Sequence, residues 1–346
     1  MIQKFLAVAI VVLVQADHSA ACSAVHYQNA QGQSYVAKSF DWKYDHGMVV
    51  VNPRGLKKRA FVPQTESGAT WTSKYGSVSF NQLAPEFPFG GINEKGLVVE
   101  ILWEYGAKSE KAEKQSATNE SQYLQRLLDL AATTEEAVAL AKEIQLISLV
   151  APVHYFVCDT NSICAVLDYT KGVLNIHSDL DLTLPFHAIT NLPYATSLKK
   201  VQKFKGMGGK KSVPSSPIFN RSAPRMARVW LASQEGKAGN EISRGFAALK
   251  TVKNWLPRTA WNIVYDQSAL GVHYLENGVP VSLDISQLDF TCAGKVVRQG
   301  VLLGANAKGI LPLSESDIST FVDQSGYMPK EFRSVLKSTY QTFACE

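Results

Sequence analysis

The N-terminal residues determine where the folded part of this chain begins. An unbroken apolar run over residues 5–14 follows a lysine, and a short polar stretch that ends in small residues follows the run. This order is typical of a secretory signal peptide, and the run is too short to span a bilayer. We therefore predict a signal peptide over residues 1–21, cleavage between Ala21 and Cys22, and one folded domain over residues 22–346 that is exported to the periplasm or secreted.

Cleavage at this point makes Cys22 the first residue of the mature chain, and three interpretations of that position are open. The signals of bacterial lipoproteins usually place leucine three residues before a lipid-modified cysteine, whereas this sequence has Ser19 there. A lipid-anchored binding protein is therefore one alternative, and a disulfide-tied binding module in which the cysteine has no chemical role is another. The third interpretation is that cleavage exposes a nucleophile.

A terminal cysteine has a property that an internal cysteine lacks. Its free α-amine has a pKa of about 7.7–8.0, so that near neutral pH much of it is an unprotonated base. The amine accepts the thiol proton directly or through one water, as in hydrolases with an N-terminal threonine or serine. No G-x-S-x-G motif offers a serine nucleophile instead. We predict that Cys22 is the nucleophile and that cleavage activates it.

The composition is that of an ordinary globular protein. Of the 346 residues 46% are hydrophobic and 19% are charged, with a net charge of +5. No stretch beyond the N-terminal run is apolar for long enough to span a membrane. The lysine-rich residues 199–211 lack the spacing of a phosphate-binding loop and contain one aromatic residue. We expect an exposed, mobile loop there and no nucleic-acid partner.

Four further cysteines leave their oxidation state open. Cys158 and Cys164 flank a turn-like segment, and Cys292 and Cys345 would hold the C-terminal tail, so two disulfides are one interpretation and free buried thiols the other. The sequence has neither a C-x-x-C pair nor an H-E-x-x-H motif. We therefore expect no metal site and no cofactor.

The hydrophobic pattern predicts an α+β fold. Short β-branched and aromatic runs between residues 22 and 103 indicate strands, and two helices follow a polar stretch, the second opening with a capping box at residues 133–136. Strands then resume, helices return at residues 226–233 and 241–252, and further strands precede a closing helix at residues 330–342. Runs of strands separated by runs of helices favour sheets that helices cover.

The segment "VAKSFDW" supplies the first candidate partners for Cys22. If this strand pairs back onto the strand that begins at Cys22, Asp41 reaches the α-amine and Lys38 lies near the sulfur. A cationic neighbour lowers the pKa of a thiol because it stabilises the thiolate.

These residues carry a resemblance to a known family. The stretch "CSAVHYQNAQGQSYVAKSFDW" resembles the start of the choloylglycine hydrolase family, which contains penicillin V acylases and bile salt hydrolases. The resemblance continues in order through "VVVNPRG", "GGINEKGL", "HAITNLP" and "SAPRMAR" and covers most of the mature chain. It implies an N-terminal-nucleophile (Ntn) hydrolase with an αββα sandwich that cleaves linear amides without a cofactor, and it suggests a homotetramer.

The same resemblance implies the roles of five residues. Cys22 is the nucleophile, Asp41 holds its amine, and Arg225 supports the site electrostatically. The side-chain amide of Asn191 and the backbone N–H of Trp103 form the oxyanion hole. A backbone donor tolerates any side chain, so the role of Trp103 does not depend on its indole.

Two departures from the family pattern bear on specificity. Lys38 replaces the usual arginine and keeps its charge without the planar fork. Trp103, together with Trp42, resembles the penicillin V acylases of Gram-negative bacteria. Two indoles that line the acyl pocket favour flat or extended apolar acyl groups. We predict hydrolysis of penicillin V and of long-chain N-acyl homoserine lactones, a quorum-quenching activity; a bile salt hydrolase or a ceramidase-like lipid amidase is the alternative.

Overall fold

The computed structural model describes most of the predicted mature chain. The described residues are 21–42, 46–62, 68–108, 117–149, 151–215, 221–235, 240–253, 259–276, 278–292, 299–302, 310–324, 330–339 and 344–345. The predicted signal peptide lies outside them except for Ala21. None of the helices that are described is long and apolar enough to cross a membrane.

A six-stranded antiparallel sheet contains both strands next to the predicted site. In spatial order its strands are β14 (Ala188–Ile189), β1 (Ser23–Gln28), β2 (Ser34–Asp41), β15 (Thr259–Asp266), β16 (Gly271–Glu276) and β17 (Val279–Asp284). The hairpin of β1 and β2 pairs Ser23 with Ser39. The predicted return of the "VAKSFDW" strand onto the first strand is therefore confirmed.

A nine-stranded sheet faces the first one. Its order is β13 (Val173–Ser178), β12 (Cys164–Thr170), β11 (Val153–Cys158), β8 (Val98–Trp103), β7 (Pro88–Asn93), β6 (Ser77–Asn81), β3 (Met48–Asn52), β18 (Gln299–Leu302) and β19 (Leu311–Pro312). Two small sheets join β9 (Ala117–Asn119) to β10 (Gln145–Ile147), and β4 (Leu56–Arg59) to β5 (Thr70–Thr72) and β20 (Ala344–Cys345).

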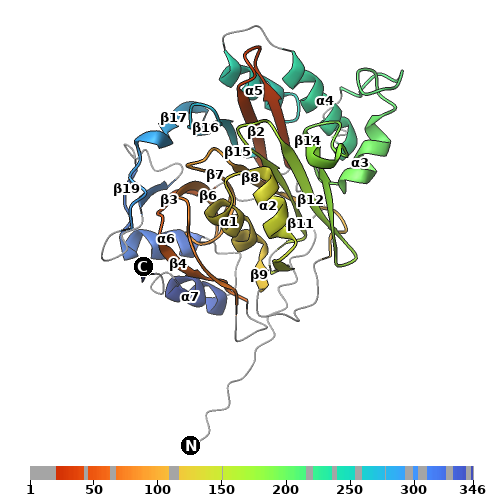
Figure 1. Cartoon of the computed structure of the whole chain (residues 1–346). Coiled ribbons are helices and arrows are strands. Elements are labelled where there is room, and N and C mark those ends of the chain that lie inside the picture. The colour runs from red at the N-terminus through yellow and green to blue at the C-terminus, as the bar shows by residue number, and fades with distance from the viewer. Residues whose placement is uncertain are drawn as a thin grey trace, which may run out of the picture.

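Helices cover the outer face of each large sheet (Figure 1). The helices α1 (Glu120–Leu130) and α2 (Thr134–Ala141) pack on the nine-stranded sheet. The helices α4 (Ser222–Gln234) and α5 (Glu241–Lys250) pack on the six-stranded sheet, with α3 (Tyr194–Val201) against α4. The last two, α6 (Glu315–Gln324) and α7 (Lys330–Thr339), enclose a separate apolar cluster with β3. The predicted αββα sandwich is confirmed.

Side-chain alternation on β1 and β2 decides what faces the core between the sheets. Lys38 lies opposite Ala24 in the register, so both point to one face, together with Cys22 and His26. Lys38 contacts Glu100 of β8, which identifies that face as the inner one. The outer face meets the helices, since the Tyr27 hydroxyl on β1 donates to a backbone carbonyl of α5.

The capping box of α2 and the lysine-rich residues 199–211 each agree with the prediction only in part. The side chain of Thr133 caps α2 as predicted, accepting from the Glu136 N–H at 3.2 Å, but the Glu136 carboxylate binds the N–H of Ala132 rather than that of Thr133. The lysine-rich segment is only partly a loop, because Lys199 and Lys200 form the last turn of α3. Its lysines are exposed, as predicted.

Both disulfides considered from the sequence are formed. Cys158 and Cys164 are paired residues of the β11–β12 hairpin, and Cys292 is joined to Cys345. Cys22 is the free cysteine.

Asn93 tests the contribution of a buried turn to stability. It is fully buried; its Oδ1 accepts from two backbone N–H groups of its own turn, and its Nδ2 donates to the carbonyls of Leu128 and Ala131 at the end of α1. Asn93→Ala should lower the free energy of unfolding by about 2–4 kcal/mol, because it leaves buried carbonyls without donors. Urea unfolding measures this change.

The matched control is Asn29, whose Oδ1 accepts from two N–H groups in an equivalent turn at the surface. Asn29→Ala should cost less than half as much. Equal losses for the two variants would contradict the role assigned to the Nδ2 of Asn93.

Candidate active site

Cys22 lies immediately before β1 with its side chain directed between the sheets. The thiol is buried, and its Sγ lies 3.9 Å from the backbone carbonyl oxygen of Asp41. Burial raises the pKa of the Cys22 thiol, although the charges of Lys38 and Arg225 act in the opposite direction. Because Ala21 still precedes Cys22 here, the nitrogen of Cys22 is an amide and not yet a base.

Asp41 ends β2, and the register that pairs Ser23 with Ser39 places it opposite Ala21 when continued by two residues. Its Oδ1 accepts from the hydroxyls of Ser39 at 2.9 Å and Thr259 at 2.6 Å. Its Oδ2 is buried without a hydrogen-bond partner among the described residues. Burial raises the pKa of Asp41 to about 6, against the hydrogen bonds and nearby cations. The carboxyl group thus has one oxygen fixed and one available to bind a cationic donor.

Arg225 connects the nucleophile to the predicted oxyanion hole. It lies in α4, is buried, and donates from Nη1 to the carbonyl of Cys22 at 2.9 Å and to the hydroxyl of Ser23 at 3.1 Å. The same nitrogen donates to the carbonyl of Ala21, and Nη2 donates to Oδ1 of Asn191. One guanidinium therefore holds the backbone at the start of β1 and the side chain of Asn191 together.

Asn191 follows β14, and each polar group of its backbone and side chain forms a hydrogen bond. Its N–H donates to the Ser222 hydroxyl at 3.0 Å and its carbonyl accepts from the Tyr105 N–H at 2.9 Å. Its Nδ2 donates to the Trp103 carbonyl at 2.8 Å, on the side of the amide opposite Arg225. These contacts fix the orientation of the amide, so that its N–H group is directed toward the end of β8.

The backbone of Trp103 faces the same region. The Glu104 N–H donates to the Pro152 carbonyl at 3.0 Å, on the β11 side of the strand. Because backbone polar groups alternate along a strand, the N–H and C=O of Trp103 point to the opposite edge, where Asn191 binds the carbonyl. The register of β7 against β8 ends at Glu100, so β7 does not cover this edge at Trp103.

Lys38 forms a buried ion pair that the sequence did not indicate. Its Nζ lies 2.7 Å from Oε2 of Glu100 and 2.7 Å from the Ile101 carbonyl, and Tyr265 donates to Oε1 of the same glutamate at 2.6 Å. The charge of Lys38 lowers the pKa of the Cys22 thiol, as predicted, but burial raises that pKa by more. Glu100 is thus a further charged group of the site.

The two predicted pocket tryptophans are neighbours. The rings of Trp42 and Trp103 have centroids 5.9 Å apart and are tilted by 36°, and both are half-buried. Trp42 also lies near Phe40, at 6.4 Å between ring centroids. The pair forms an aromatic surface at the ends of β2 and β8, next to the carbonyl that binds Asn191.

A polar cavity of about 540 Å³ lies elsewhere, between the β1–β2 turn and the start of α5. It is lined by Asn29, Gln31, Gln33, Tyr35, Asn240, Glu241, Ile242 and Asp266. Tyr35 stands at the opposite end of β2 from Asp41, about 20 Å away along the strand. We assign this cavity no part in the site, because none of the predicted site residues lines it.

Sequence reasoning named the candidate reactive residues but missed the residues that contact them. Ser39, Thr259, Ser222, Tyr105 and Glu100 each contact a predicted site residue. Ser39 stands two residues before Asp41 in one strand, a spacing that places both on one face. For the other residues the sequence offered no signal, since strand pairing and helix packing bring them to the site.

The raised pKa of Asp41 predicts a pH-dependent stability for the chain that retains Ala21. The pKa of about 6 exceeds the value of about 3.9 expected in an unfolded chain, so the folded state binds the proton more tightly. The contribution is full below about pH 4 and is lost as the pH rises through about 6. Between pH 4 and pH 7 the free energy of unfolding should fall by about 2–3 kcal/mol more in this chain than in Asp41→Asn. Equal pH profiles by urea unfolding would refute this.

Alkylation of Cys22 tests the charge of Lys38. Lys38→Met should slow labelling by iodoacetamide near neutral pH and raise the pH of half-maximal labelling, because a cation near the thiolate is lost. Glu100→Gln should shift the profile to lower pH, because the charge of Lys38 is then no longer offset. The double variant Lys38→Met/Glu100→Gln, which leaves no unpaired buried charge, controls for damage to the fold. Unchanged profiles in both single variants would remove Lys38 from the site.

The sequence and the fold are similar to those of known proteins. The sequence model described as "Linear amide C-N hydrolases, choloylglycine hydrolase family" matches residues 22–216. A penicillin V acylase from Pectobacterium atrosepticum is 27% identical over 232 residues, 61% of this chain and 59% of that protein. The chain thus matches about three fifths of the length of this relative.

Two solved structures share the fold. The penicillin V acylase from Agrobacterium tumefaciens superimposes with a TM-score of 0.71 at 19% identity, covering 85% of this chain and 98% of that chain. A mutant of the conjugated bile acid hydrolase from Clostridium perfringens gives a TM-score of 0.64 at 16% identity, covering 85% and 96%. Because the family match begins at Cys22 and extends over more than half of the sequence, this chain belongs to the choloylglycine hydrolase family of linear amide C–N hydrolases.

Proposed function

We propose that this protein is an exported amidase that uses Cys22, exposed by removal of residues 1–21, to hydrolyse penicillin V and related linear amides. The observation that supports the proposal most is the contact made by Arg225, which binds the carbonyl of Cys22 and the side chain of Asn191 at once. A nucleophile and an oxyanion donor are thereby held next to each other in a buried site.

Removal of Ala21 would create the missing base. The new α-amine of Cys22 forms next to Asp41, whose Oδ2 has no partner among the described residues, and a protonated amine satisfies that oxygen. The cleavage also frees the Arg225 donor that now binds the Ala21 carbonyl. An ammonium group beside the carboxylate lowers the pKa of Asp41 and, as a nearby cation, that of the thiol.

The reaction then proceeds through a thioester. The α-amine takes the proton of the Cys22 thiol, and the thiolate attacks the amide carbon, which forms the bond from sulfur to carbon. The negative charge on the oxygen of the tetrahedral intermediate is stabilised by the N–H of Trp103 and by the second hydrogen of Asn191 Nδ2, whose first hydrogen binds the Trp103 carbonyl.

Collapse of the intermediate breaks the C–N bond, and the leaving amine receives the proton from the α-ammonium. The α-amine next removes a proton from water, and the resulting hydroxide attacks the thioester. Departure of the Cys22 thiolate releases the acid and restores the enzyme. No step needs a group beyond the residues named and water.

The adjacent rings of Trp42 and Trp103 support a preference for the acyl group. Two indoles 5.9 Å apart and tilted by 36° offer a narrow apolar aromatic surface, which suits a phenoxyacetyl ring or a straight acyl chain better than a broad steroid. We therefore place long-chain N-acyl homoserine lactones with penicillin V among the substrates and conjugated bile salts outside them. A homotetramer and a periplasmic location remain part of this proposal.

The oxyanion hole predicts a defined loss of rate. Asn191→Ala should lower kcat by about 10²- to 10³-fold with a smaller change in KM, the usual effect of losing one donor to the oxyanion. Ser222→Ala, which removes the acceptor of the Asn191 N–H and a hydrogen bond to the Thr190 hydroxyl but no donor to the oxyanion, should cost less. Steady-state kinetics on penicillin V measure both, and near-normal turnover of Asn191→Ala would show that Asn191 has a structural role only.

The substrate assignment is tested by kcat/KM on one preparation for penicillin V, a long-chain N-acyl homoserine lactone and glycocholate. We expect hydrolysis of the first two and little of the third. Faster hydrolysis of glycocholate than of both others would overturn the pocket argument. No amine release from any of the three, with Cys22 as the first residue, would favour a binding protein instead.

Variants of the two indoles refine this test. Trp42→Ala and Trp103→Ala should each reduce kcat/KM for penicillin V. Phe40, whose ring stacks on Trp261 at 4.5 Å in the buried core, provides the control, since Phe40→Leu should alter stability rather than the ratio of substrate rates.

A further inference from the structure

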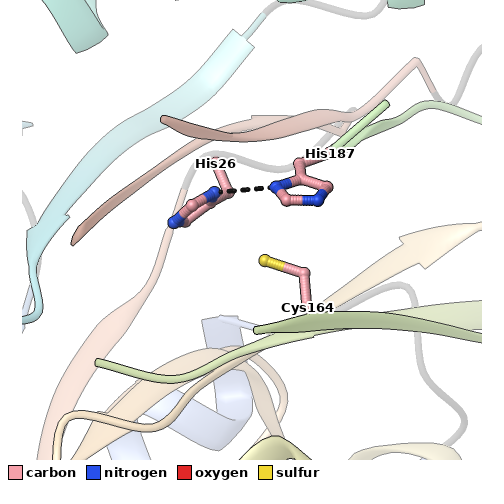
Figure 2. A group of neighbouring side chains, drawn as sticks. All are labelled: His26, Cys164 and His187. Carbon is pink, nitrogen blue, oxygen red and sulfur yellow. Dashed lines mark hydrogen bonds between the residues drawn. The ribbon is translucent and has the colours of Figure 1, made fainter. Parts of the chain in front are cut away.

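A cluster of two histidines and a cysteine lies between the two large sheets, apart from the site described above (Figure 2). His26 is on β1, His187 directly precedes β14, and Cys164 begins β12 of the opposite sheet. One ligand atom from each lies within 4.8 Å of the others, and the two Nδ1 atoms are 3.1 Å apart. His26 and Cys22 share one face of the first strand, about 13 Å apart along it.

The protonation state of His187 follows from its neighbour. Its Nε2 lies 2.8 Å from Oδ1 of Asp179, and the other oxygen of that carboxylate accepts the Cys164 N–H at 2.7 Å. A carboxylate that accepts on both oxygens requires the imidazole to donate. In the neutral ring the proton is therefore on Nε2, and Nδ1 presents a lone pair.

The same reasoning applies to His26, whose Nε2 lies 2.9 Å from the Ser34 hydroxyl. Gln267 donates from Nε2 to the carbonyls of Gly96 and Cys158, so its Oε1 must be the acceptor of the Ser34 proton at 2.7 Å. Ser34 has one proton and has donated it, so it accepts from His26. Nδ1 of His26 is then also a lone pair in the neutral ring.

In the neutral rings these two lone pairs, 3.1 Å apart, would repel each other, so the contact requires either a proton shared between the rings, as in a hydrogen bond, or a metal cation between them. Zinc–imidazole bonds of about 2.0–2.1 Å at the tetrahedral angle place two nitrogens about 3.3–3.4 Å apart, which is close to this separation. The outer nitrogen of each ring is already held by a polar side chain, as is usual for histidines that bind metals. The pair therefore has the geometry of a metal site with two ligands in place.

The third ligand depends on the disulfide. While Cys164 is bonded to Cys158 its sulfur is not a thiolate. Reduction would make it one, and a rotation of the freed side chain would bring the sulfur from within 4.8 Å of the two nitrogens to the separation of about 3.5 Å that a tetrahedral zinc site needs. Asp179 orients the site from outside, because it binds both His187 and the backbone of Cys164. Thiolate and imidazole together are ligands that Zn²⁺ prefers.

We propose that His26, His187 and the thiolate of Cys164 bind a zinc ion when the Cys158–Cys164 disulfide is reduced. A phosphine reductant breaks the S–S bond and becomes the phosphine oxide, taking its oxygen from water, whose two hydrogens go to the two sulfurs. Binding of Zn²⁺ then displaces the proton of the Cys164 thiol to solvent. The ion joins the six-stranded sheet to β12 of the nine-stranded sheet, whereas the disulfide connects only neighbouring strands β11 and β12.

The site is tested without reductant by two variants that each free one sulfur. Cys158→Ser leaves Cys164 as a thiol beside the histidines, whereas Cys164→Ser leaves Cys158. After incubation with Zn²⁺ and gel filtration, Cys158→Ser should retain about one zinc per chain and Cys164→Ser at least tenfold less. Cobalt in place of zinc should give cobalt–thiolate absorption in Cys158→Ser only. Equal zinc retention in the two variants would overturn the proposal.

A second pair of variants, made in the Cys158→Ser background, separates this site from other metal binding. His187→Gln should abolish zinc retention. His177→Gln is the matched control, because His177 is 20% exposed and lies 4.0 Å from Asp168, while His187 is 22% exposed and paired with Asp179. Retention that survives His187→Gln, or that is lost equally in both variants, would overturn the proposal.

Discussion

The buried guanidinium of Arg225 is the interaction on which the site depends. Its donors bind the backbone at Cys22, the hydroxyl of Ser23 and the side chain of Asn191, which come from β1 and from the segment after β14. Hydrogen bonds to a charged group contribute about 1.5–3 kcal/mol each, and a buried cation without acceptors is costly. The packing of α4 on the six-stranded sheet therefore brings Cys22 and Asn191 together. The hydrogen bonds of Arg225 thus stabilise the fold and position the candidate catalytic residues at the same time.

Burial sets the state of the reactive groups before cleavage. It raises the pKa of the Cys22 thiol and brings that of Asp41 to about 6, so both groups keep their protons to a higher pH than usual while Ala21 is attached. A new ammonium group at Cys22 would lower both pKa values, because a cation stabilises the ionised forms of neighbouring thiol and carboxyl groups. Removal of the preceding residues would thus supply the base and the charge that the thiolate needs.

The sequence allowed much of this to be predicted, for reasons that differ between residues. The hairpin of β1 and β2, the cap of α2 and the αββα order follow from local patterns and family resemblance. The resemblance also named Asp41, Asn191 and Arg225, which the structure places in contact with Cys22 or with one another. Glu100 could not be predicted, because it meets Lys38 only when two sheets stack. The histidine cluster was missed for a similar reason, since its members are dispersed and match no metal-binding motif.

The central claim is that cleavage before Cys22 creates the catalytic base, and one comparison tests it most directly. Two preparations that differ only in whether Ala21 is retained, with N-termini verified by mass spectrometry, are assayed on the amide that is hydrolysed fastest. Urea unfolding verifies that both are folded at the pH of the assay. The account predicts thioester formation and turnover only in the chain that begins with Cys22. Equal turnover by the folded chain that retains Ala21 would contradict it.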